Sequence, residues 1–145
     1  MYPEEIVAPM REELTSLGFK EVRTILEVQE ILEKKGLLLM VINSVCGCAA
    51  GNARPAVKLA LQKAPRPHYL ATVFAGQDLE ATEYLRSKIN YPPSSPSIAL
   101  FKDGKVVFML QRLDLQGYAP DAIARKLRTA FDTYCKEKET ILKNH

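Results

Sequence analysis

The chain has 145 residues, of which 47% are hydrophobic and 26% charged, and its formal net charge is +3. This length and composition predict one soluble globular domain over residues 1–145. The small, interspersed charge argues against a nucleic-acid surface, which needs a sustained basic patch. The longest apolar run, Leu37 to Ile42, is too short to cross a bilayer. We therefore expect neither a nucleic-acid nor a membrane partner.

The N-terminal residues and the cysteines bear on the compartment. Residues Met1 to Glu5 carry neither the basic start nor the apolar core of a signal peptide. We therefore expect a cytoplasmic protein, whose thiols are kept reduced. Three cysteines in such a chain are not a disulfide framework. The two that are separated by one residue, Cys46 and Cys48, are the candidates for chemistry.

The first two elements in chain order are predicted to be helices. The first runs from Pro3 to Leu17, and its apolar stripe at helical spacing consists of Ile6, Met10, Leu14 and Leu17. The second begins at Thr24, which forms a capping-box pattern with Glu27. Its inward face is predicted to be Ile25, Val28, Ile31 and Leu32.

The next segment leads through the cysteines. Leu37 to Ile42 is continuously apolar, which predicts a central strand buried on both faces. A helix then runs to about Lys63. It starts either just after Cys48, with a kink at Pro55, or at an Asn52 cap, and the sequence leaves both starts open.

The second half predicts a strand, a helix, a hairpin and a closing helix. The strand is Tyr69 to Ala75, and the helix is capped by Asp78 and ends near Lys88. The hairpin joins Ser97–Phe101 to Lys105–Leu110 through an Asp-Gly turn. The closing helix runs from Ala119 to about Lys138, with an inward face of Ile123, Leu127, Ala130, Phe131 and Tyr134. Strands and helices in this order indicate an α/β fold, with helices on both faces of the sheet.

The pair Cys46 and Cys48 lies where a central strand feeds a helix. The free N–H groups and positive end of a helix N-terminus stabilise a thiolate and lower the cysteine pKa. We expect Cys46, which comes first, to be the nucleophile and Cys48 to be the resolving thiol. Gly47 lets the backbone bend between them. A disulfide across one intervening residue closes a tight ring, which is easier to reduce and favours removal or shuffling of disulfides.

Simpler interpretations of the cysteines also exist. Cysteines are often small buried hydrophobes, and this is our interpretation of Cys135, one helical turn after Phe131. A metal site needs about four ligands. Only Cys135, His68 and His145 remain as further soft partners, so we expect no metal.

The segment from Asn43 to Gly51, followed by Arg54-Pro55-Ala56, is similar to the active-site stretch of the bacilliredoxins. Residues 73–78 and 93–97 resemble two further segments of that family, and the resemblance covers essentially the whole chain. It implies a thioredoxin-like fold with a central mixed β-sheet. It also implies the reduction of mixed disulfides between proteins and bacillithiol, a small thiol that replaces glutathione in some bacteria.

The resemblance implies that Cys46 takes the small thiol from an S-thiolated client protein, and that Cys48 or free bacillithiol then clears it. Bacillithiol is thus expected as a co-substrate, with no bound cofactor. The expected substrate-binding residues are Asn43, Ser44, Gly47, Ser95 and Pro96.

Pro96 opens a predicted strand, a position that tolerates proline in any case. Together with the resemblance, it leads us to expect a cis Ser95-Pro96 bond beside Cys46, where the adjacent backbone can pair with an extended substrate. The segment Gln111–Gly117 departs from the family, because it lacks the histidine expected after Arg112. We assign that segment no role.

Two other functions remain open. A protein disulfide isomerase would act on dithiol proteins, and the family has also been regarded in this way. A redox-inactive binding module would use the same fold without turnover, and an unreactive Cys46 would reveal it.

Overall fold

The computed structural model describes the backbone of residues 1–143 and the side chains of residues 1–135. A five-stranded mixed sheet forms its centre, with strands in the order β1-β3-β2-β4-β5. β2 pairs in parallel with β3, which pairs in parallel with β1, whereas β4 is antiparallel to both β2 and β5. The strands are β1 (Lys20–Glu21), β2 (Leu37–Asn43), β3 (Tyr69–Phe74), β4 (Ser97–Lys102) and β5 (Lys105–Leu110). The predicted mixed α/β sheet is confirmed.

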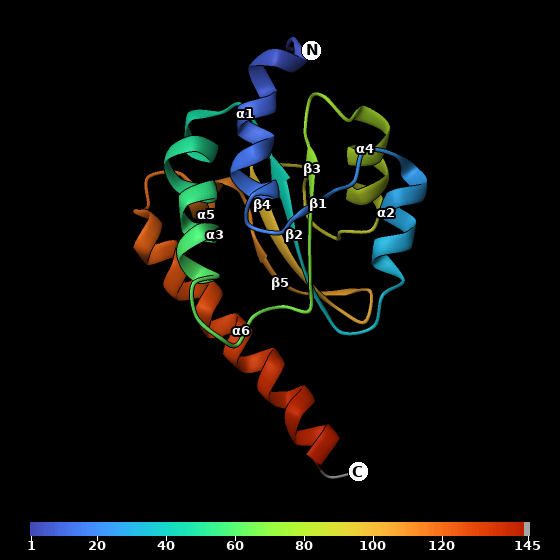
Figure 1. Cartoon of the computed structure of the whole chain (residues 1–145), viewed down its shortest axis with the longest axis vertical. Coiled ribbons are helices and arrows are strands. Elements are labelled where there is room, and N and C mark those ends of the chain that lie inside the picture. Colours follow the sequence, from blue (N-terminus) through green and yellow to red (C-terminus); the bar gives the residue numbers. More distant parts are fainter. Residues whose placement is uncertain (144–145) are drawn as a thin grey trace.

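The helices cover both faces of this sheet (Figure 1). Side chains of α1, α3 and α6 share one apolar cluster, and those of α2 and α4 share the other. The helices are α1 (Glu4–Thr15), α2 (Ile25–Leu32), α3 (Arg54–Ala60), α4 (Leu79–Ser87), α5 (Arg112–Leu115) and α6 (Pro120–Lys143), with a π-helical turn η1 (Ala49–Ala53) ahead of α3.

β2 is the strand on which the fold is built. All of its residues are buried, as its unbroken apolar sequence predicts. Successive side chains point to opposite faces, so Leu39 and Val41 enter the α1/α3/α6 cluster while Met40 and Ile42 enter the α2/α4 cluster. β2 therefore fixes where the segment after Asn43 emerges from the sheet.

The buried faces of α1 and α2 differ from the predicted ones. In α1 the buried residues are Val7, Arg11 and Leu14, and Ile6 is 51% exposed. Arg11 takes an inward position because it forms a buried ion pair with Asp78. In α2 the capping threonine accepts the predicted hydrogen bond from the Glu27 N–H, and Val28 and Ile31 are buried. Ile25 is 38% exposed, so its predicted inward place is wrong.

The alternatives for the helix after the cysteines are resolved. Gly47 and Cys48 are already helical and lead directly into η1 and α3. Asn52 lies inside η1 and does not begin the helix. Pro55 has no N–H to donate to the preceding turn, and the wider π-helical turn η1 ends two residues before it.

The remaining differences from the predicted elements concern two short elements, the end of α6 and the cap of α4. β1 and α5 were not predicted, because two and four residues are too few to show a periodicity. α6 runs five residues beyond the expected end near Lys138. Asp78 stands at the start of α4 but makes no side-chain cap, since its carboxylate is occupied by Arg11 and by the Phe74 N–H. The hairpin turn is confirmed, with positive φ at Asp103 and Gly104.

Candidate active site

The two thiols lie just beyond the carboxyl end of β2. The Sγ atoms of Cys46 and Cys48 are 2.9 Å apart, and both cysteines are free. Cys46 is partly exposed, whereas Cys48 is 8% exposed. The carbonyl of Cys46 accepts hydrogen bonds from the N–H groups of Ala49 and Ala50, which makes Cys46 the last residue before the helix. The structure thus offers one accessible sulfur and one covered sulfur in direct contact.

The two thiols are electrostatically unequal. The pKa of Cys46 is lowered, chiefly because the Cys48 side chain hydrogen-bonds the thiolate, and further by a backbone N–H and by the positive charge of Arg112. The pKa of Cys48 is raised, chiefly because burial disfavours its charged form, and further by its hydrogen bond to Cys46. As the pH rises, the pair therefore loses its first proton from Cys46 rather than from Cys48.

A hydrogen-bonded chain of side chains shapes the turn between β2 and Cys46. Asn43 Oδ1 accepts from the Ser44 N–H at 2.9 Å, and Ser44 Oγ accepts from the Cys46 N–H at 3.0 Å. Asn43 Nδ2 donates to the carbonyl of Met10 in α1 at 3.1 Å. Asn43 and Ser44 are both buried. They lie under the thiols and hold the backbone, so their side chains are not open to a substrate in this structure.

Arg54 holds this turn in place through buried hydrogen bonds. Its side chain is 3% exposed, and Nη1 donates to Asn43 Oδ1 at 2.8 Å and to the Ser44 carbonyl at 2.9 Å. Nε donates to Glu13 at 2.9 Å. The sequence analysis gave Arg54 no role of its own. An arginine on an otherwise apolar helix face, beside the buried Ala53, Ala56 and Val57, is the signal that could have found it.

The Ser95-Pro96 bond is cis, as expected. Sheet register places it at the same edge as the thiols, because Ser97 pairs with Ile42 near the end of β2. Pro96 is buried and Ser95 is partly exposed. Gly47 is exposed, and a Cβ added there would meet nothing within 4 Å. An open surface therefore adjoins the two sulfurs.

The remaining candidate residues lie elsewhere. Cys135 is 7% exposed, and its Sγ contacts the carbonyl of Arg66 at 3.6 Å. His68 Nδ1 accepts from the Leu37 N–H at the opposite end of β2 from the thiols. Within the described part of the chain, no cluster of three or more potential ligands could hold a metal ion. None of the helices described there combines the length and apolar character needed to span a bilayer.

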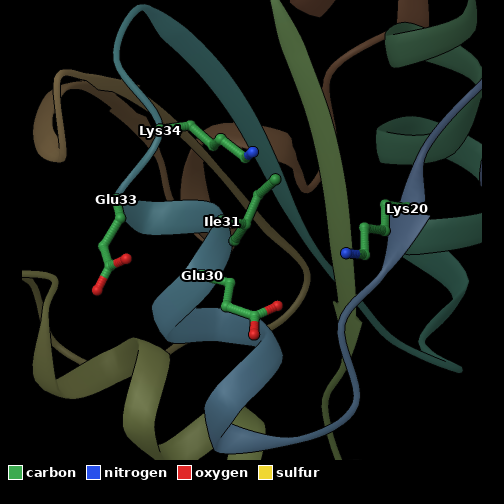
Figure 2. A pocket seen from close by; sticks show the side chains of 5 residues that line it. All are labelled: Lys20, Glu30, Ile31, Glu33 and Lys34. Carbon is green, nitrogen blue, oxygen red and sulfur yellow. The ribbon is translucent and has the colours of Figure 1, made fainter.

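A polar hollow of about 400 Å³ lies beside the C-terminal part of α2 (Figure 2). Side chains of both signs border it, namely Lys20, Glu30, Glu33 and Lys34, together with Ile31. Most of its lining residues come from the segment that leads into the start of β2, whereas the thiols follow the end of that strand. The hollow therefore takes no part in the thiol site.

Comparison with known proteins identifies the family. A sequence profile described as disulphide isomerase matches residues 2–135. A bacilliredoxin of Shouchella clausii is 51% identical over 94% of this chain and 95% of its own. A bacilliredoxin of Cytophaga hutchinsonii is 48% identical over 91% of this chain and 98% of its own. The chain belongs to the bacilliredoxin family.

Solved structures add the fold. Fasciola hepatica thioredoxin matches with a TM-score of 0.56 and 20% identity, over 80% of this chain and 99% of its own. Mitochondrial thioredoxin 3 of Saccharomyces cerevisiae matches with a TM-score of 0.56 and 14% identity, over 81% of this chain and 98% of its own. The expected thioredoxin fold is confirmed. With the family established, this bacilliredoxin relative is a thiol–disulfide oxidoreductase.

Proposed function

We propose that the protein removes bacillithiol from mixed disulfides with client proteins, with Cys46 as nucleophile and Cys48 as resolving thiol. The observation that carries the proposal is the contact of 2.9 Å between two free sulfurs of unequal exposure. Only the more exposed one, Cys46, has a lowered pKa. A thiolate that is both accessible and stabilised is the species that attacks a disulfide.

The first step is an exchange with balanced atoms and electrons. The Cys46 thiolate attacks the small-thiol sulfur of the client mixed disulfide, forming a new S–S bond between Cys46 and the small thiol. The old S–S bond breaks, and its electron pair leaves with the client sulfur, which takes a proton from solvent. The client is reduced, and Cys46 carries the small thiol.

The second step clears Cys46, and the geometry supports two routes. Cys48, already in contact with Cys46, can lose its proton, attack the Cys46 sulfur and release the small thiol, leaving a Cys46–Cys48 disulfide that a low-molecular-weight thiol then reduces. Alternatively, free bacillithiol attacks the small-thiol sulfur and leaves as its own disulfide, returning the Cys46 thiolate. In the first route the raised pKa of Cys48 keeps it protonated until Cys46 has reacted and lost its charge.

The other expected substrate-binding residues fall into two groups. Gly47, Ser95 and Pro96 border the open surface beside the sulfurs, where we place the extended client backbone. Asn43 and Ser44 act from beneath, by holding the backbone that carries Cys46. We place the reaction in the cytoplasm, where client thiols are kept reduced.

The test uses two variants and one model client that carries bacillithiol on a single cysteine. Cys48→Ser should take up bacillithiol on Cys46 and hold it as a mixed disulfide, seen by mass spectrometry, and added free bacillithiol should restore turnover. Cys46→Ser should transfer nothing. Activity in Cys46→Ser overturns the assignment of the nucleophile. A Cys48→Ser protein that stays inactive with free bacillithiol excludes the monothiol route and makes Cys48 obligatory.

Disulfide isomerase is the second candidate function, because the matching family profile carries that description. Isomerisation starts from the same Cys46 thiolate but attacks a disulfide within one protein. Refolding of a protein that carries non-native disulfides distinguishes the isomerase from the enzyme that removes bacillithiol. Recovery of native activity that requires Cys46, with no uptake of bacillithiol from mixed disulfides, favours the isomerase.

A further inference from the structure

Sheet register brings a positively charged side chain to the edge that holds the thiols. β4 pairs with β2 through Ile42 and Ser97, and with β5 through Ile98 and Leu110. The end of β2, the start of β4 and the end of β5 therefore lie side by side. Cys46 follows β2 by three residues, and Arg112 follows β5 by two. Residues far apart in sequence thus meet around one surface.

The backbone at Arg112 is held in place. Gln111 and Asp114 form a reciprocal capping box at the start of α5. The Arg112 N–H donates to Ser94 Oγ at 3.3 Å, and Gln111 Nε2 donates to the Pro92 carbonyl at 3.0 Å. These bonds tie α5 to the proline-rich segment that leads into the cis bond. The position of Arg112 relative to the thiol edge is therefore built into the fold.

The side chain of Arg112 differs from the other arginines near the site. Arg11 and Arg54 are buried and paired with carboxylates. Arg112 is exposed, and its guanidinium pairs with no carboxylate among the described residues. It lies close enough to the thiols for its charge to act on both, contributing to the lowered pKa of Cys46 and opposing the burial that raises the pKa of Cys48. An unpaired guanidinium beside a nucleophile is available to a ligand.

We propose that Arg112 is a specificity-determining residue that binds a carboxylate of the small thiol while Cys46 attacks the mixed disulfide. This inference rests on the proposed function of Cys46 and adds the residue that anchors the small thiol.

Electrostatics supply the reason. An anionic substrate is repelled by the Cys46 thiolate that must attack it, and a fixed positive charge at the same edge offsets that repulsion. Arginine presents parallel N–H groups that match both oxygens of a carboxylate, so it orients the small thiol as well as attracting it. A lysine at this position would keep the charge but lose the bidentate geometry.

The test separates recognition from reactivity. A one-cysteine peptide is prepared as its mixed disulfide with 3-mercaptopropionate, 2-mercaptoethanol or cysteamine, which are similar in size and anionic, neutral and cationic. Each is offered to the Cys48→Ser protein, and the rate of transfer to Cys46 is followed by mass spectrometry. The same measurement is made with Arg112→Gln, Arg112→Lys or Arg66→Gln added. Arg66 is exposed and precedes β3, at the opposite edge of the sheet, so it is the matched control.

The readout is the rate for the anionic probe divided by the rate for the neutral one, because a change in the thiolate fraction of Cys46 cancels in that ratio. Arg112→Gln should lower the ratio about fivefold, the scale of one partly exposed ion pair, and raise the relative rate of the cationic probe. Arg112→Lys should recover part of the loss, and Arg66→Gln should leave the ratio unchanged. Equal slowing of all three probes, or an unchanged ratio in Arg112→Gln, overturns the inference and leaves the proposed function standing. Absence of transfer from every probe, while a client that carries bacillithiol still reacts, also overturns the inference, and absence of transfer from that client as well overturns the proposed function itself.

Discussion

Replacing Arg54 by methionine tests whether the turn that carries Cys46 is held from below. Methionine keeps an unbranched apolar stem, so it fills much of the same space while removing the guanidinium. The change deletes the hydrogen bonds to Asn43 Oδ1 and to the Ser44 carbonyl. It also deletes the ion pair with Glu13. The expected result is a less stable protein with a slower Cys46.

The magnitude follows from the environment of each bond. Hydrogen bonds from a charged donor contribute about 1.5–3 kcal/mol each, and two of them are buried here. Glu13 is 49% exposed, and ion pairs at such positions contribute under about 1 kcal/mol. Asn43 Oδ1 keeps its bond from the Ser44 N–H, which reduces the loss. We expect the free energy of unfolding to fall by about 3 kcal/mol, the lower end of the sum.

Urea denaturation of the reduced protein measures the stability, and the rate of alkylation at a fixed pH measures the reactivity of Cys46 under native conditions. Arg54→Lys should lie between wild type and Arg54→Met, since one ammonium cannot reproduce the fork that reaches both acceptors. Arg66→Gln is the control for loss of an exposed arginine and should change the stability by less than about 0.5 kcal/mol. A loss in Arg54→Met no larger than in that control would refute the reasoning, and so would unchanged alkylation despite a large loss of stability.

Two further predictions concern the thiols and the buried ion pair between Arg11 and Asp78. Cys48→Ala should move the midpoint of the alkylation–pH profile of Cys46 upward, because the largest cause of the lowered Cys46 pKa is the hydrogen bond from Cys48; an unmoved midpoint in stopped-flow alkylation contradicts this origin. Since a lowered pKa favours the anion, the rate in wild type should already have levelled off at pH values where the variant is still rising. Asp78→Asn should lower the free energy of unfolding by about 3 kcal/mol, because it leaves the buried Arg11 with only the half-exposed Glu4 as its carboxylate partner. Asp121→Asn, at an exposed pair with Arg125, should change it by less than about 0.5 kcal/mol in the same denaturation assay.

The parts of the fold that the sequence predicted correctly are those encoded locally. The apolar run from Leu37 to Ile42 could only be a buried strand, and the Asp-Gly pair at 103 and 104 fixed the hairpin. Both outcomes depend on neighbours in sequence. The placement of Cys46 and Cys48 directly after a central strand was predicted in the same way, because their spacing and their position along the chain are visible without the fold.

The parts that were missed depend on partners far along the chain. Arg11 is inward only because Asp78, 67 residues later, accepts two hydrogen bonds from it. Arg54 bonds residues 10 and 11 positions earlier, and Arg112 comes to the thiol edge only through the register of β4 with β2 and β5. Hydrophobic periodicity carries no information about such pairings. They become visible only when the strands are placed side by side.

The unequal behaviour of the two thiols follows from where the helix begins. Cys46 is the last residue of the turn and is partly exposed, whereas Cys48 is already helical and is buried. A separation of one residue thus keeps the sulfurs in contact while giving them different surroundings. Burial raises the pKa of Cys48, and a hydrogen bond from the Cys48 thiol lowers the pKa of Cys46. The unequal exposure on which the proposed roles of the two thiols rest is therefore set by the backbone that Asn43, Ser44 and Arg54 hold.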